Sequence, residues 1–307
     1  MGDFLTRAPG KAMIFGEYAV LEGAPAVVAA VDRYVAVRRD PAAPPSDSPF
    51  VRTACAAAGQ SPTGLHIDSS ALYAGGDGGR KLGFGSSAAV TVAVYQANRP
   101  AAPKETTYAA CKAAHDEAQG QVGSGADLAA AIWGGVLRFQ PTAMDPTITP
   151  IDPAGGLDLL LVDTGEPAST GDRIAAWRRI ARDRSQEARP IRTALTALAQ
   201  AFATADHAAD WIDLARRWNE PLAALEALTD LPILTLAHRR IAAIAQPLGA
   251  AAKPSGAGGG DLAICFVPPS ETQELRRRLT AAGFPPLPLQ IGAPGVHRIP
   301  LDTEMAS

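Results

Sequence analysis

A glycine-serine stretch that runs straight into an apolar segment is the feature that most constrains how this chain folds. It reads GFGSSAAV, from Gly83 to Val90, and VTVAVY continues from Val90 to Tyr95. Glycine destabilises the interior of helices and strands, so this stretch is expected to form a loop. The apolar run after it predicts a helix from Ser86 to Asn98, with Ser86 or Ser87 near the N-cap. Two interpretations are open: a Gly-Ser cap on a buried helix, or a loop that holds a phosphate.

The phosphate interpretation rests on backbone donors. Gly83 and Gly85 let the chain turn with its amides pointing inward and no side chain in the way. The helix that follows adds unpaired N–H groups and the positive end of its dipole. Loop hydroxyls can bind phosphate oxygens or magnesium. The stretch is not a Walker A loop, because no glycine of the chain precedes Lys-Ser or Lys-Thr. It is not a dinucleotide motif either, because Ala88 stands where the last glycine is required.

A second glycine-rich stretch lies near the other end of the sequence. KPSGAGGGD runs from Lys253 to Asp261 and leads into the apolar segment LAICFV, Leu262 to Val267. So many small residues are costly in chain entropy. A flexible linker would not be expected between an apolar helix and a buried strand. The two stretches together therefore suggest two loops that bind one phosphorylated ligand.

The rest of the chain mixes strand and helix patterns without regular alternation. We predict strands over residues 12–15, 27–31, 34–37, 136–139, 157–162, 262–267 and 296–301, and helices over 86–98, 103–119, 126–131, 236–246 and 271–282. Trp211 and Trp218 lie at helical spacing and are expected in the core. This pattern favours the α+β class.

Composition limits the classes of partner and the compartment. The net charge is −3, which does not favour nucleic acid or an acidic membrane surface as a partner. The odd set Cys55, Cys111 and Cys265 has no metal-ligand spacing and argues against a disulfide framework. The sequence does not open with a signal-peptide pattern and has no apolar run long enough to cross a bilayer. We therefore expect a cytoplasmic protein with no membrane partner.

Three motifs in order resemble those of the GHMP kinases, the superfamily of galactokinase, homoserine kinase, mevalonate kinase and phosphomevalonate kinase. They are APGKAMIFGEYAVL (Ala8 to Leu21), GFGSSAA (Gly83 to Ala89) and KPSGAGGGD (Lys253 to Asp261). Within the superfamily, Tyr18 after Gly-Glu and the turn DTGEPAST (Asp163 to Thr170) are similar to bacterial phosphomevalonate kinases. HDEAQG followed by GSGAD, residues 115–127, is similar to the same family.

The resemblance implies a fold and an activity. The fold is a two-lobed GHMP kinase fold, with a ribosomal protein S5 domain 2-like N-terminal lobe over residues 1–155 and a ferredoxin-like C-terminal lobe over residues 156–307. The activity is ATP-dependent phosphorylation of (R)-5-phosphomevalonate, with ATP as co-substrate and Mg²⁺ as its ion. Mevalonate kinase or another small-molecule GHMP kinase is the alternative, and a non-catalytic ligand-binding regulator is a third. The chain is expected to be a monomer or a homodimer.

The same resemblance implies roles for individual residues. Lys11 and Asp127 would be catalytic, with Lys11 close to Asp127 and neutralising the charge on the transferred group. Ser87 would bind magnesium, helped by His115, Asp116 or Glu117. The implied phosphate-binding residues of the ATP loop are Gly83, Gly85, Ser86, Ser87 and Ala88. The implied substrate-binding residues are Ser124, Ser169, Thr170, Lys253, Ser255, Gly256, Ala257 and Gly258.

Each of these residues also has an ordinary structural explanation. Asp127 alone would be an acid favoured by the N-terminal end of a helix dipole. Lys11 alone would be a solvated lysine, and Arg173 a solvated helix residue. Glu17 lies among apolar residues, so its charge must be exposed or partnered. The segment between Asp40 and Gly83 is shorter than in typical members, so the adenine contacts are not identified.

Overall fold

The computed structural model describes residues 4–76, 78–142, 145–152 and 156–301. The chain forms two compact units, and each is assembled from separate parts of the sequence. The first comprises Met1–Ala12, Val28–Leu137 and Leu289–Ser307, and the second comprises Met13–Val27 and Arg138–Pro288. The division expected after residue 155 falls at residues 153–155, which lie outside the described residues, and it stays a prediction.

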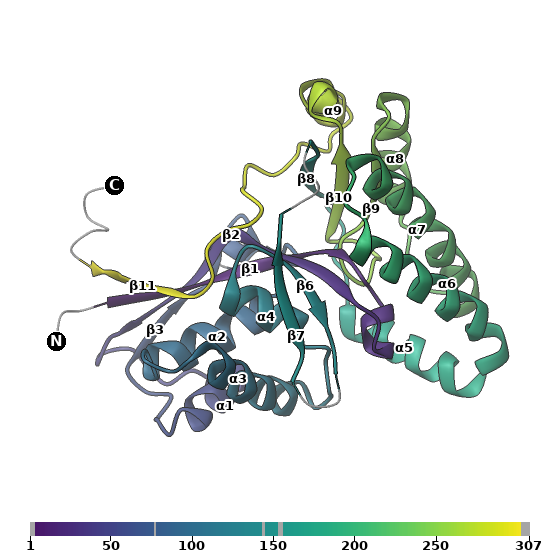
Figure 1. Cartoon of the computed structure of the whole chain (residues 1–307). Helices are drawn as coiled ribbons and strands as arrows, with labels where there is room; N and C mark the ends of the chain where they lie inside the picture. The colour runs from purple at the N-terminus through teal and green to yellow at the C-terminus, as the bar shows by residue number, and fades with distance from the viewer. Residues whose placement is uncertain (1–3, 77, 143–144, 153–155, 302–307) are drawn as a thin grey trace. The chain divides into compact units, whose positions relative to one another are not determined.

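The first unit is a sheet with helices gathered on one side of it (Figure 1). Its strands in sheet order are β11 (His297–Pro300), β1 (Phe4–Phe15), β2 (Ala26–Arg39) and β6 (Val136–Gln140), with β3 (Leu65–Asp68) paired to β2. A separate antiparallel pair consists of β4 (Tyr73–Ala74) and β5 (Arg80–Lys81). The helices are α1 (Pro49–Ala57), α2 (Ser86–Asn98), α3 (Lys104–Gln119) and α4 (Ala126–Trp133). Helices α2 and α3 each contact the other three helices of this layer.

Buried, mostly apolar residues explain why α2 is enclosed by its neighbours. Seven of its residues are buried, and they lie on most sides of the helix instead of along one stripe. A helix that is apolar all round is stable only when it is enclosed by other elements. Because α2 is packed on most sides, its N-terminus, where the glycine-serine stretch ends, is held in a fixed position.

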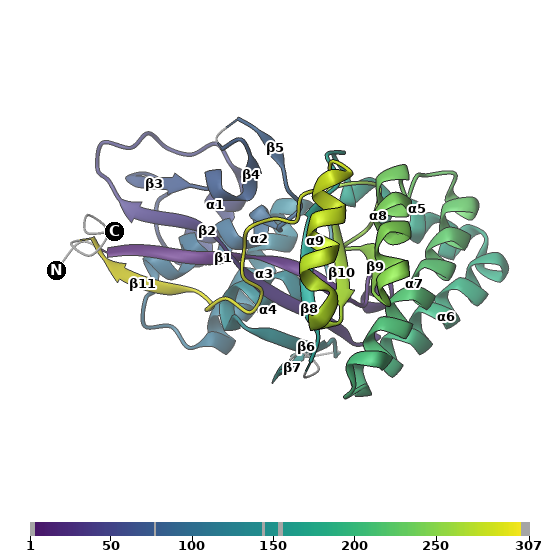
Figure 2. The same ribbon diagram turned by 90° about the horizontal axis from the view of Figure 1, so that it is seen from above.

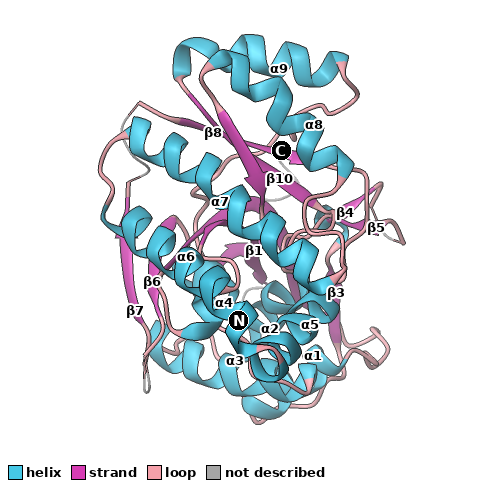
Figure 3. Ribbon diagram, turned by 90° about the vertical axis from the view of Figure 1, so that its right-hand side faces the viewer, coloured by secondary structure: helices cyan, strands magenta, loops and turns pink. Residues whose placement is uncertain are grey.

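The second unit is a helix-rich layer around a short antiparallel sheet (Figures 2 and 3). Its strands in sheet order are β8 (Asp158–Asp163), β10 (Leu262–Val267) and β9 (Ala251–Pro254). Strand β7 (Thr147–Ile151) does not belong to this sheet; it pairs with β6 at the edge of the six-stranded sheet. Its helices are α5 (Thr170–Asp183), α6 (Ser185–Thr204), α7 (Ala208–Thr229), α8 (Leu236–Ala245) and α9 (Thr272–Ala281). Helices α7 and α8 both contact β9 and β10.

Two groups of buried side chains hold the second unit together. One is apolar and mostly aliphatic, and it fills the space between β8, β9, β10 and the helices α8 and α9. The other is aromatic: Phe202 stacks on Phe15 with ring centroids 3.5 Å apart, and Trp218 meets Phe15 edge-on at 5.1 Å. Phe15 belongs to the first sequence motif, so this motif is anchored by the aromatic group.

Several predictions from the sequence are confirmed and some are wrong. The helix over 86–98 is α2, and the strand over 262–267 is β10. Residues 27–31 and 34–37 are parts of one strand, β2, and helix α1 was not predicted. Trp211 and Trp218 are buried, and the three cysteines are buried free thiols. In the described residues there is no helix whose length and hydropathy would let it cross a membrane.

Candidate functional site: two glycine-rich loops and their partners

In the first unit, the glycine-serine stretch forms a loop between β5 and the start of α2. Gly85 is the N-cap of α2 in a left-handed conformation, φ 70°, and α2 has no side-chain cap. Ser86 and Ser87 are the first two helical residues, next to the N-cap, as the sequence predicted. A Cβ at Gly85 would lie 3.0 Å from Lys11 Cε, which explains glycine there. The amides at the start of α2 are thus left to water or to a ligand.

Lys11 runs alongside this loop from β1. Its backbone N–H donates to Phe84 O at 2.8 Å, and its ammonium Nζ donates to Gly83 O at 3.3 Å. The ammonium therefore adds positive charge at the same place as the dipole of α2. Both features favour an anion at this loop.

The hydroxyl of Ser87 is oriented by a histidine on α3. Ser87 Oγ lies 3.1 Å from His115 Nε2, and Gln119 Nε2 lies 3.1 Å from the same nitrogen. His115 is only 3% exposed, so it is a buried partner of Ser87 and not a surface histidine. This contact connects the phosphate loop to α3.

The loop before α4 is held by Asp116, the residue after His115. Asp116 Oδ2 pairs with Lys112, and its Oδ1 accepts from Gly123 N at 3.0 Å. Ser124 Oγ accepts from Ala126 N at 3.3 Å, in the same loop. Asp127, in the first turn of α4, is half-buried, and its Oδ1 accepts from Leu128 N at 3.0 Å. Helix α4, like α2, begins at a left-handed glycine without a side-chain cap.

The side chains around Ser87 offer too few metal ligands to hold Mg²⁺ by themselves, so they fit this ion only if it would arrive bound to a nucleotide. Asp116 is engaged by Lys112 and Gly123, and Glu117 is exposed. The described residues contain no group of three or more His, Cys, Asp or Glu side chains that could hold a metal. Mg²⁺ commonly keeps several waters and is bound through one or two protein groups and substrate phosphates. Ser87 supplies one such oxygen, and His115 is a poor ligand for so hard an ion.

In the second unit, the third motif contains a buried ion pair. The Lys253 ammonium pairs with Glu17 Oε1, with the two side chains 0% and 2% exposed, and also donates to Pro254 O at 2.8 Å. It lies 5.0 Å from the ring centroid of Phe15. Burial raises the pKa of Glu17 and lowers that of Lys253, while each charge favours the ionised form of its partner. The ammonium is enclosed by these partners, which gives Lys253 a structural role in this unit, and substrate binding by Lys253 stays a prediction.

The residues after Lys253 are also bonded to the first motif. Ser255 is buried and its Oγ donates to Met13 O at 3.0 Å. Gly256 N donates to Glu17 Oε1 at 3.3 Å, and Tyr18 Oη donates to Ala257 O at 2.5 Å. The first and third motifs, far apart in sequence, therefore form one junction in this unit.

The DTGEPAST turn is bonded to the other end of the third motif. Asp261 Oδ1 accepts from Ala168 N at 3.1 Å, and Asp261 N donates to Glu166 O at 2.7 Å. Ser169 is the N-cap of α5, where its Oγ accepts from Asp172 N. Ser169 and Thr170 are both exposed. The turn therefore presents two hydroxyls and a helix start on a firmly anchored loop.

Arg173 is a residue whose role the sequence did not reveal. Its guanidinium donates to Ser169 O at 3.0 Å, and to Pro232 O and Gly259 O at 3.3 Å each. Gly259 has a positive φ of 78°, and a Cβ there would lie within 2.0 Å of this guanidinium, so a side chain would be strained and would displace Arg173. The expectation of a solvated helix residue is therefore wrong. Its position four residues after an N-cap serine was the only signal in the sequence.

The predicted site residues thus form two groups. The first unit holds Lys11, Gly83, Gly85, Ser86, Ser87, Ala88, Ser124 and Asp127, and the second holds Ser169, Thr170, Lys253, Ser255, Gly256, Ala257 and Gly258. Within the first unit, Lys11 contacts the phosphate loop, and Ser124 and Asp127 share the start of α4.

Comparisons with known proteins agree with this arrangement of motifs. No protein-family model matches the chain. The phosphomevalonate kinase of Streptomyces sp. (strain CL190) is 29% identical over 94% of this chain and 97% of the relative. The structure resembles Streptococcus pneumoniae phosphomevalonate kinase in complex with phosphomevalonate and AMPPNP, with a TM-score of 0.76, 20% identity, and coverage of 94% and 99% of the two chains. The chain therefore has the GHMP kinase fold, and its sequence is similar to a phosphomevalonate kinase over nearly its whole length.

A further solved structure supports the same fold. The Lin0012 protein of Listeria innocua has a TM-score of 0.85 at 22% identity, covering 97% of this chain and 99% of the other. The GHMP kinase fold therefore extends over nearly all of the chain, as the three motifs predicted. The α+β class and its antiparallel sheets agree with that fold.

Proposed function

We propose that this GHMP kinase transfers the γ-phosphoryl group of ATP to (R)-5-phosphomevalonate and forms (R)-5-diphosphomevalonate, in the mevalonate route to isoprenoids. The observation that carries the choice of acceptor is the anchored turn at Ser169 and Thr170. It offers exposed hydroxyls and a helix start, which suit a substrate that already bears a phosphate. Similarity to phosphomevalonate kinase over 94% of the chain supports the same choice.

The first unit supplies the groups that we assign to ATP. The uncapped start of α2, the glycine backbone of residues 83–85 and Lys11 would bind the phosphates. The substrate is Mg-ATP, and Ser87 Oγ would bind its ion from a position set by His115. Phosphoryl transfer depends on alignment and on stabilising charge, more than on covalent chemistry by the protein. Asp127 would orient the attacking phosphate oxygen, which is largely ionised near neutral pH because its second pKa is about 6.

The second unit supplies the groups that we assign to the acceptor. Ser169 Oγ accepts from Asp172 N, and its hydroxyl proton is still able to donate to a phosphate oxygen. Thr170 and the first amides of α5 would add further donors. The backbone of residues 256–258 completes the set that we assign in the second unit. Ser124, in the first unit, stays a proposed substrate-binding residue. Lys253 and Ser255 would act by holding this backbone in place.

The compartment and the assembly are part of the same proposal. Three buried free thiols suit a reducing cytoplasm. We propose a cytoplasmic enzyme that acts as a monomer or a homodimer. Size-exclusion chromatography with light scattering distinguishes these two assemblies.

The experiment is ADP release by the purified protein with Mg-ATP. Mevalonate, 5-phosphomevalonate and homoserine are offered in parallel, with Asp127→Ala as the matched inactive variant. We expect turnover on 5-phosphomevalonate alone, lowered by about 10²- to 10⁴-fold in the variant. Turnover on mevalonate instead would overturn the role of Ser169 and Thr170 and leave the phosphate loop intact. No ADP release with any acceptor would favour a non-catalytic regulator.

A further inference from the structure

A cavity of about 450 Å³ lies in the second unit among α7, α8 and β9. None of its lining residues belongs to the three superfamily motifs. Most of its wall is apolar, formed by Leu234 and by alanines of α8 and of residues 250–252. Pockets of this size suit small organic ligands, which are recognised by a few placed polar groups.

Two arginines supply positive charge to the cavity. Arg216 uses Nη2 to donate to Gly249 O at 2.7 Å and Ala250 O at 3.4 Å, so no carboxylate is among its contacts with the described residues. Arg239 pairs with Glu226 through Nη2, and its side chain is 51% exposed. A guanidinium has five N–H donors, so both side chains keep donors for an anion. Burial lowers the pKa of His238 to about 4, so this third basic residue of the wall is neutral near pH 7.

The side-chain amide of Asn219, on α7, favours a ligand that carries a hydrogen-bond donor. Asn219 Nδ2 donates to Ala252 O at 2.8 Å, which fixes the orientation of the amide. Its Oδ1 is buried and has no hydrogen-bond partner among the described residues. A buried acceptor without a partner is unfavourable, so a ligand hydroxyl or N–H would improve this site.

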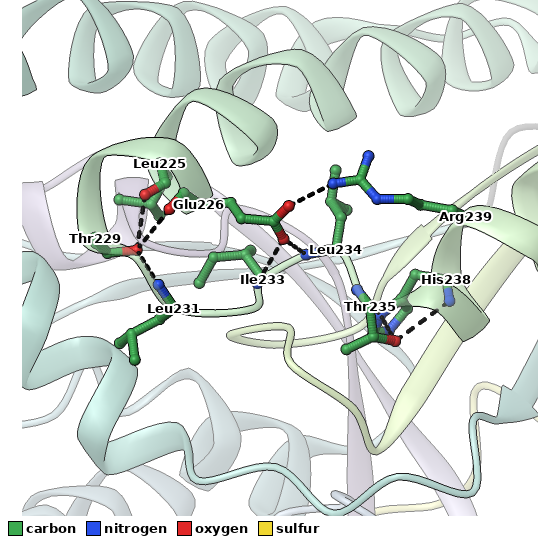
Figure 4. Close-up of polar contacts among 9 residues, drawn as sticks. All are labelled: Leu225, Glu226, Thr229, Leu231, Ile233, Leu234, Thr235, His238 and Arg239. Atoms are coloured by element: carbon green, nitrogen blue, oxygen red, sulfur yellow. Dashed lines mark hydrogen bonds and ion pairs between the residues drawn. The ribbon is translucent and has the colours of Figure 1, made fainter.

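The cavity wall is bonded to the segment that supports the third motif (Figure 4). Glu226 Oε2 accepts from Ile233 N at 2.8 Å and from Leu234 N at 2.7 Å. Its other oxygen, Oε1, pairs with the Arg239 guanidinium. Ile233 O accepts from Gly259 N at 2.8 Å, in the third motif. One carboxylate therefore connects a cavity arginine with the backbone that holds the glycine-rich loop.

We propose that this cavity is a regulatory site for a small organic anion that has an apolar body and a hydrogen-bond donor. Arg216 and Arg239 bind the anionic group, the alanines contact the body, and Asn219 Oδ1 accepts from the donor. Binding draws Arg239 away from Glu226 and loosens the hold of that carboxylate on Ile233 and Leu234. The site itself does not depend on the proposed kinase reaction, because binding is measured without turnover.

The test uses 6-hydroxyhexyl phosphate as the probe, with hexane-1,6-diol as its uncharged counterpart, in isothermal titration calorimetry of the full chain. We expect the diol to bind at least about tenfold more weakly, because it lacks charge-assisted hydrogen bonds. Arg216→Gln and Arg239→Gln should each weaken probe binding by about tenfold or more. Arg217→Gln is the matched control, since Arg217 is the next residue of α7, pairs with Asp213 and does not line the cavity.

A filled cavity and a backbone measurement complete the test. Ala243 is exposed at the cavity wall, so Ala243→Phe should abolish binding and leave the core intact. Hydrogen–deuterium exchange should become faster over residues 231–235 when the probe is bound. Equal binding of probe and diol, or equal losses in Arg216→Gln and Arg217→Gln, would overturn the proposal. So would probe binding that survives Ala243→Phe, since the probe would then occupy another site.

Discussion

The two glycine-rich loops look alike in sequence and differ in what they do with their polar groups. The loop at residues 83–87 leaves the first amides of α2 without a side-chain cap, and its serines are half-buried. The loop at residues 253–261 bonds its polar groups inside the protein, with Lys253 on Glu17 and Ser255 on Met13 O. The first leaves backbone donors available, which is why we assign it to ligand binding, and the second is mainly a junction between distant segments. A glycine-rich motif by itself therefore does not show which of these two roles it has.

The largest effect should come from breaking the buried pair of the second loop. Lys253→Met leaves the Glu17 carboxylate buried and uncompensated, which should cost about 3–5 kcal/mol of unfolding free energy. Urea unfolding measures this loss. The double variant Glu17→Met with Lys253→Met should recover most of it, because no unpaired charge remains. A single variant within about 0.5 kcal/mol of the native chain would contradict the structural role of Lys253.

The next effect is a pH dependence at the end of the second loop. His238 donates from Nε2 to Leu262 O and accepts at Nδ1 from Thr235 N, and burial lowers its pKa from 6.5 to about 4. The unfolded chain therefore binds the proton more tightly between these values. The contribution of His238 to the unfolding free energy is fully present above pH 6.5. It is lost as the pH falls toward 4, and the unfolding free energy is lower by about 2 kcal/mol at pH 5.

The variant His238→Gln isolates this contribution. The difference in unfolding free energy between the native chain and the variant should shrink by about 2 kcal/mol from pH 7.5 to pH 5. Urea unfolding at both pH values gives the two differences. Equal differences at the two pH values would show that His238 does not titrate in this way.

A matched pair of glycines compares the two loops directly. Gly85 and Gly256 both have positive φ, 70° and 107°, so alanine at either position should cost about 1–3 kcal/mol in strain. At Gly85 the new Cβ would also press on the Lys11 side chain. Gly85→Ala should therefore weaken Mg-ATP binding, while Gly256→Ala should lower stability with little effect on Mg-ATP. Calorimetric titration and urea unfolding of both variants separate the two results, and the reverse pattern would break the comparison.

The smallest effects should come from a matched pair of serines. Ser87→Ala removes a hydroxyl assigned to the nucleotide, so Mg-ATP affinity should fall by about tenfold with little change in stability. Ser255→Ala removes the donor of the buried Ser255 side chain from the partly buried Met13 carbonyl and should cost about 1–2 kcal/mol of stability. Mg-ATP affinity of Ser255→Ala should stay within about twofold of the native chain. Similar nucleotide losses in both variants would mean that the second loop also contacts ATP.

Local sequence patterns were enough for the elements that carry strong local signals. Helix α2 follows from glycines that cannot continue a strand and from the apolar run behind them, and β10 follows from six consecutive apolar residues. Weak local signals were missed. Helix α1 is short, and β9, with the sequence AAKP, has no β-branched residue and is a strand only because it pairs with β10.

By itself, the sequence determined the α+β class, the GHMP kinase fold and the place of the glycine-serine loop before α2, because motifs and periodicity are local properties of the chain. The partners of the charged and polar side chains were decided only by the tertiary structure. Lys253 meets Glu17 across 236 positions of sequence, and Asp261 meets Ala168 across 93. Such contacts depend on which distant segments pack together, since a buried charge must find its partner wherever the fold places one.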